Sequence, residues 1–165
     1  MTKKTLAILV AFGALLAASA LAGQRLEGWF DYEHCAYCRA WAAQPGLVAH
    51  SHDEAHELSD GIVWVTTIDN GYEDAFAKAL KAEDSVTAEL NAGKDLPLCR
   101  YCATIGDLAH EGARIEAVPC HSALVTIYSS ADTSVVRQLR EFGVTGTAKI
   151  AQANAGYLSR HQSAH

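Results

Sequence analysis

The sequence lacks the residue patterns that mark several common functions. It has no cluster of lysines and arginines interleaved with aromatic residues, and its scattered charges sum to −6, so nucleic acid is not expected as a partner. It also has no Ser/His/Asp pattern typical of a hydrolase, no glycine-rich phosphate loop and no HExxH motif. These absences favour a binding protein over an enzyme.

The only apolar stretch long enough to suggest a membrane segment lies at the N-terminus. Lys3 and Lys4 precede an uncharged run from Leu6 to Leu21, which ends in Ala20-Leu21-Ala22. A basic start, a short apolar run and a small-x-small site are typical of a secretory signal peptide, and the run of about 16 residues is shorter than a spanning helix. We therefore predict a cleaved signal peptide over residues 1–22, no stable membrane span after cleavage, and a periplasmic or secreted protein.

The predicted mature chain, residues 23–165, has a length typical of one domain with an apolar core. It contains all five cysteines of the sequence. In an oxidising compartment, free thiols persist only when they are paired, buried or bound to metal. The arrangement of the cysteines is therefore the most informative feature of the chain.

Four cysteines form two Cys-x-Tyr-Cys motifs, Cys35-Ala36-Tyr37-Cys38 and Cys99-Arg100-Tyr101-Cys102, with 64 residues between equivalent positions. Four thiols are the number that a tetrahedral Zn²⁺ site needs. They could equally form structural disulfides or redox-active dithiols. Cys120 belongs to neither motif.

The same order of elements is predicted after each motif: a short helix, an extended stretch, a β-rich run and a long helix. The apolar runs Ile62–Ile68 and Leu124–Tyr128 predict strands, and Pro119 confines the strand before the second run to an edge or a bulge. Long helices are predicted over 72–92 and 133–158, with a bend near Gly143 and Gly146. The predicted fold is α+β, with about four antiparallel strands and packed helices.

We interpret this repetition as a tandem duplication of a CxxC-α-β-β-α unit, with halves at about 28–92 and 93–160. If the halves pack about a twofold axis, the two motifs can meet beside it. A helix N-terminus at each motif would favour the thiolate form, which binds metal. The sequence thus predicts a four-cysteine site of Cys35, Cys38, Cys99 and Cys102 for zinc or another thiophilic metal.

The residues beside the motifs bear on two other uses of the cysteines. Covalent haem requires CxxCH, but Arg39 and Ala103 follow the motifs, so no haem c is expected. The segment Phe30–Cys38 resembles the active-site segment of exported thioredoxin-fold oxidoreductases, which often have an aromatic residue before the second cysteine. This resemblance covers fewer than ten residues and implies a redox-active dithiol, so a thiol–disulfide protein, stapled or catalytic, is the alternative function.

A second group of candidate ligands lies in the segment after the first motif. His50, His52 and His56 are spaced so that a strand would place them on one face, where imidazoles could hold Zn²⁺ or Cu²⁺. The same spacing suits the solvated outer face of a hairpin. The predicted partner is a metal ion, with a homo-oligomer or a periplasmic protein as further candidates.

Overall fold

The structure is a computed structural model that describes residues 24–162, so the predicted signal peptide lies outside the described part of the chain. An α+β fold is confirmed, with a four-stranded antiparallel sheet and four α-helices. Within residues 24–162, no helix is long and apolar enough to cross a membrane. In chain order, the elements are α1 (Ala36–Ala42), the 3-10 helix η1 (Leu47–His50), β1 (Ser51–Leu58), β2 (Gly61–Ile68), α2 (Glu73–Asn91), α3 (Arg100–His110), β3 (Arg114–Pro119), β4 (Ala123–Ser129) and α4 (Thr133–Gln162).

The sheet consists of two hairpins joined through their second strands, in the order β1-β2-β4-β3. Val65 of β2 lies opposite Val125 of β4 in the central antiparallel pair. Strands β1 and β3 form the two edges, and Pro119 ends β3, where the missing N–H costs no central ladder bond. The edge position predicted from Pro119 is confirmed.

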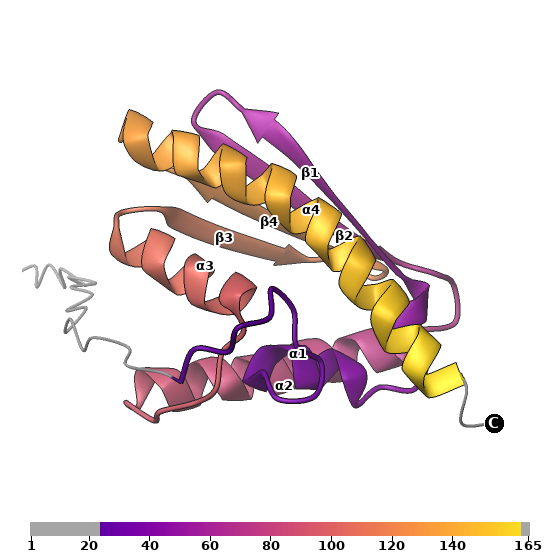
Figure 1. The fold of residues 1–165 in the computed structure, drawn as a ribbon. Coiled ribbons are helices and arrows are strands. Elements are labelled where there is room, and N and C mark those ends of the chain that lie inside the picture. Colours follow the sequence, from indigo (N-terminus) through magenta and orange to yellow (C-terminus); the bar gives the residue numbers. More distant parts are fainter. Residues whose placement is uncertain (1–23, 163–165) are drawn as a thin grey trace, which may run out of the picture.

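One face of the sheet carries the main apolar core. Ile62, Trp64 and Thr66 alternate along β2 and are buried on this face. Helix α4 runs diagonally across β1 and β2 on the same side (Figure 1). Leu139 of α4 is fully buried there and Phe142 almost so, because the apolar stripe of the helix meets the alternating apolar side of the strands.

Helix α4 is one continuous helix, so a break into two helices at its glycines is wrong. Gly143 and Gly146 lie where the helix closely approaches the sheet. A Cβ on Gly146 would lie 2.8 Å from Cζ3 of Trp64, and one on Gly143 would lie 3.2 Å from Cδ1 of Ile62. Both glycines therefore make room for the strand side chains instead of breaking the helix.

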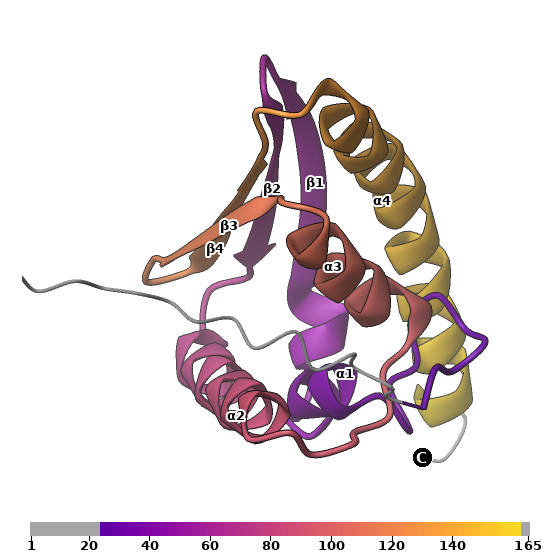
Figure 2. The ribbon, with the colours of Figure 1, turned by 90° about the vertical axis from the view of Figure 1, so that its left-hand side faces the viewer.

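The helices of the first half occupy a different place. Helix α2 packs mainly on α1, and both lie at one end of the molecule beyond the sheet (Figures 1 and 2). Only the first turns of α2 reach the sheet, where Phe76 joins a small core with Leu47 and Ile68. The β3–β4 hairpin projects above α2 in Figure 2, and every residue of β3 is exposed.

Both halves have the order that the sequence predicted. In each, a helix that begins just after the first cysteine of the motif is followed by a hairpin and then by a long helix. The segment from Leu47 to Leu58, predicted as extended, divides into the 3-10 helix η1 and the strand β1. The origin of the two halves by duplication remains a prediction.

Candidate metal centre

The fold brings the two CxxC motifs together. The Sγ atoms of Cys35 and Cys102 lie 3.7 Å apart, and those of Cys38 and Cys99 lie 3.6 Å apart. All four sulfurs lie within 4.8 Å of one another. The prediction that two motifs distant in sequence share one place is confirmed.

The two CxxC motifs occupy the same position relative to their helices. Cys35 is the N-cap of α1 and Cys99 is the N-cap of α3, both with extended backbone angles. The second cysteine of each motif follows within the first helical turn and therefore faces the same side as the first. Two helix N-termini thus direct their first turns, and their positive dipole ends, toward the sulfurs.

Backbone hydrogen bonds hold the two motifs side by side. The Ala36 N–H donates to the Pro97 carbonyl across 2.9 Å, which joins the start of α1 to the segment before α3. The chain before the first motif supplies the other side: the Arg100 and Tyr101 N–H groups donate to the carbonyls of Gly28 and Trp29. Orphan N–H groups at the start of α3 are satisfied in this way, and the approach of the second motif is fixed.

The sulfurs lie in an apolar environment. Cys35 and Cys99 are fully buried, Cys38 is 6% exposed, and Cys102 is half-buried. Apolar and aromatic side chains pack around them, which limits the access of water to most of the sulfurs. These neighbours are Leu26, Phe30, Tyr32, Tyr37 and Tyr101.

The close approach of the four thiols shifts their pKa values in opposite directions. The contact with Cys102 is the largest influence that lowers the pKa of the Cys35 thiol below its ordinary value. The same contact raises the pKa of Cys102 well above that value, and burial adds to the increase. The pKa of Cys99 is also lowered, chiefly by its contact with Cys102. Thiolate, which a lowered pKa favours, is the form of cysteine that binds metal.

The sulfur spacing fits a tetrahedral metal better than a disulfide. With metal–sulfur bonds of ~2.3 Å, neighbouring ligands of a tetrahedral Zn²⁺ lie about 3.8 Å apart. The distances of 3.6 and 3.7 Å are close to this edge length. A disulfide requires about 2.05 Å between sulfurs, and all five cysteines are free thiols in the structure.

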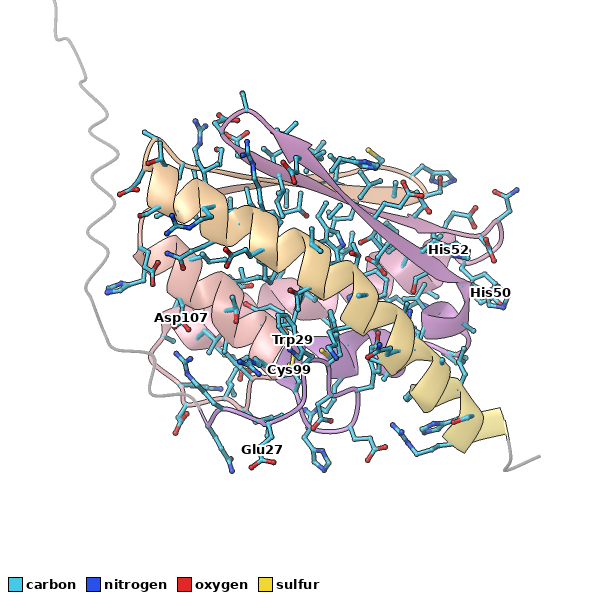
Figure 3. All side chains as sticks on the ribbon, turned by 45° about the horizontal axis from the view of Figure 1, so that its top comes forward. Glu27, Trp29, His50, His52, Cys99 and Asp107 are labelled. Carbon is cyan, nitrogen blue, oxygen red and sulfur yellow. The ribbon has the colours of Figure 1, made fainter. Side chains whose placement is uncertain are left out.

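The histidines of the second predicted site lie elsewhere. Figure 3 shows His50 and His52 at the edge of the molecule, away from Cys99 beneath α4. Nδ1 of His50 and Nε2 of His52 lie 2.8 and 3.1 Å from the two carboxylate oxygens of Asp69, whereas His56 contacts Glu54. Within residues 24–162, only the four cysteines form a group of three or more possible ligands. A metal role for His50, His52 and His56 remains a prediction.

Cys120 also lies apart from the centre. It is exposed just after β3, in the connection to β4, and its N–H donates to the Ala123 carbonyl across 2.7 Å. Its thiol is therefore available as an internal reference for reactivity measurements on the other four.

Two half-buried carboxylates near the centre were not predicted from the sequence. Asp53 lies on the inward face of β1, between the exposed His52 and Glu54, and Glu83 lies on α2. Both line a cavity of about 430 Å³ that also reaches Cys38 and Cys102. The period-2 alternation of β1 could have indicated the inward position of Asp53, but an acidic residue is rarely expected inside.

No protein-family model, curated protein or solved structure matches this chain. The functional conclusions therefore depend on the chemistry and geometry of the site.

Proposed function

We propose that the protein is exported and binds one Zn²⁺ ion through Cys35, Cys38, Cys99 and Cys102. The observation that carries this proposal is the pair of sulfur–sulfur distances between the two motifs, 3.6 and 3.7 Å. Four sulfurs at this spacing, on two different helices, form a ligand set complete for a tetrahedral ion.

The burial of the ligands favours a structural ion over a catalytic one. Catalytic zinc keeps an open coordination position for water or substrate, whereas a closed set of four protein thiolates leaves none. Three of the four cysteines are buried. Zinc would join α1 to α3, and its binding energy would become folding energy for the whole domain.

Export gives the ion a second effect. Thiols in an oxidising compartment form disulfides unless something protects them. A bound d¹⁰ ion occupies the reactive lone pair of each sulfur and so keeps the cluster reduced. The N-terminal sequence of the secreted protein tests export directly: it should start at Gly23 or within a residue or two, and intact Met1 in a membrane fraction would contradict cleavage.

The metal is tested on the purified mature protein by elemental analysis combined with a thiol count. We expect one zinc per chain, one thiol that reacts at once, and four more that react only after a chelator and denaturant are added. Cys120→Ser should remove the fast-reacting thiol and leave the zinc unchanged. Replacement by Co²⁺ should give the visible absorption typical of tetrahedral thiolate coordination.

The alternative function, a thiol–disulfide protein, predicts a different metal content and a different thiol count. In a thiol–disulfide protein, no stoichiometric metal is present and only Cys120 is free when the protein is isolated without reductant. That result would overturn the zinc proposal.

A further inference from the structure

The cavity lined by Asp53 and Glu83 has features that the metal site does not use. It has a volume of about 430 Å³ and lies between the inward face of the sheet and helices α1, α2 and α3. This volume is within the range of small-molecule sites in proteins. Its wall is mostly apolar and rich in aromatic rings, including Trp41, Trp64, Tyr101 and Tyr128.

The charged groups of the cavity all have one sign. Asp53 projects from the sheet wall and Glu83 from the α2 wall, and no Lys, Arg or His is among the described residues that line the cavity. Asp53 and Glu83 are both half-buried. Because neither has a cationic partner in this largely apolar cavity, a cationic ligand would be stabilised there.

The protein holds each carboxylate by only one of its oxygens. Oδ1 of Asp53 accepts hydrogen bonds from Trp64 Nε1 at 2.9 Å and Thr66 Oγ1 at 2.6 Å. Oε1 of Glu83 accepts one from Trp41 Nε1 at 2.8 Å. The second oxygen of each group has no such donor within residues 24–162, and neither is among the fully buried unpaired atoms of that region. The free oxygen of Asp53 and the free oxygen of Glu83 therefore have fixed orientations and remain accessible.

We infer that this cavity binds a small organic cation with an apolar body, such as an aromatic or alkyl ammonium ion. The free carboxylate oxygens of Asp53 and Glu83 accept hydrogen bonds from the ammonium group. The aromatic wall covers the apolar body and adds cation–π attraction. Lining residues Cys38 and Cys102 place the ligand beside the metal centre, but the site does not depend on metal being bound.

A series of three probes of similar shape and different charge tests this assignment on the wild-type protein as purified. The probes are phenethylammonium, 2-phenylethanol and 3-phenylpropionate, titrated by calorimetry at pH 8. We expect phenethylammonium to bind at least about tenfold more tightly than the alcohol, and the anion to bind most weakly. Equal affinity for all three, tighter binding of the alcohol or the anion, or no heat from any probe would overturn the assignment.

Two isosteric substitutions identify the groups that recognise the charge. Asp53→Asn and Glu83→Gln each keep the oxygen that accepts from the tryptophan and replace the other oxygen with an NH2 group, which removes both the negative charge and the free acceptor. The double variant should bind phenethylammonium and 2-phenylethanol with equal affinity, while the affinity for the alcohol stays within about twofold of wild type. A preference for ammonium that survives in the double variant would show that other groups recognise the cation and would contradict the assignment.

Asp74→Asn is the matched control, because Asp74 is an exposed acidic residue on the same helix as Glu83. It makes the same change in net charge outside the cavity and should leave the preference unchanged. If Asp74→Asn weakened phenethylammonium binding as much as Glu83→Gln, the effect would be long-range and the cavity assignment would be wrong. Should the double variant fail to fold, the single variants and the wild-type probe series still decide the question.

Discussion

The two halves of the chain repeat one order of elements but use their long helices differently. Helix α4 of the second half lies across the hairpin of the first half, with Leu139 fully buried. Helix α2 of the first half has no equivalent place on the β3–β4 hairpin and packs on α1 instead. A twofold arrangement is thus kept at the central strands and the cysteines and is broken by the long helices.

The difference has a consequence for the interior. Where α4 covers the sheet, aromatic and aliphatic side chains fill the space between them. Where α2 does not cover the sheet, the inward side chains of β3 and β4, among them Ala117 and Thr126, line the cavity. The different placement of the two long helices therefore leaves a cavity beside α2, while α4 remains packed on the sheet.

The largest effect should come from the element that both halves share. Serine at any one of Cys35, Cys38, Cys99 or Cys102 leaves three ligands, so zinc affinity should fall strongly and the free energy of unfolding should drop by several kcal/mol. Metal content and urea denaturation check this, with Cys120→Ser as the unaffected control. In a redox dithiol the two cysteines have different roles, because one is the nucleophile and the other resolves the mixed disulfide. If Cys38→Ser trapped a mixed disulfide and left stability unchanged, the four cysteines would not be equivalent metal ligands.

The next largest effect should be a difference in stability loss between substitutions in α4 and in α2. Leu139→Ala removes a fully buried side chain from under α4 and should cost about 2–5 kcal/mol of unfolding free energy. Leu90→Ala in α2 removes a half-buried side chain that already borders the cavity, so its cost should be smaller, by about 1 kcal/mol or more. Equal losses in urea denaturation would show that α2 is anchored as firmly as α4.

Glu83 on α2 should make the free energy of unfolding depend on pH. Burial is the main cause that raises the pKa of Glu83 from 4.5 to about 7. Between these values the folded protein binds a proton that the unfolded chain does not, so the free energy of unfolding should fall as pH rises from 4.5 to 7. The decrease should be about 1–3 kcal/mol in total.

Glu83→Gln isolates this contribution, because every other titrating group is the same in both proteins. The stability difference between wild type and the variant should change with pH in that interval and be constant below it. A difference independent of pH from 4 to 8 would show that Glu83 titrates normally and that α2 leaves it in water.

The smallest effects concern the glycines of α4. Alanine at Gly146 would place its Cβ 2.8 Å from Trp64 and should cost about 1–3 kcal/mol of stability. Alanine at Gly156 meets only the flexible end of Arg160 at 3.6 Å and should instead stabilise the helix by about 0.5–1 kcal/mol. Thermal denaturation of both variants shows whether each substitution raises or lowers stability. Stabilisation by Gly146→Ala would show that α4 does not approach β2 so closely.

Sequence patterns predicted most of the local structure correctly. The β-branched run before Asp69 and the apolar stripe after Gly71 predicted β2 and α2 to within a residue or two. The glycines of α4 were misread, because a glycine that breaks a helix and a glycine that admits a neighbouring ring look the same in sequence. Their meaning depends on Trp64, which lies far away along the chain.

The sequence by itself determined the kind of ligand that the site can hold, because four thiols in two CxxC motifs suit a thiophilic metal wherever they lie. It also determined the elements, because periodicity and turn residues are local properties. Only the tertiary structure decided that Cys35 meets Cys102 and Cys38 meets Cys99, since this depends on how the hairpins pair and how α1 and α3 pack. Packing likewise decided the cavity, because only the path of α2 brings Glu83 to the same cavity as Asp53 of β1.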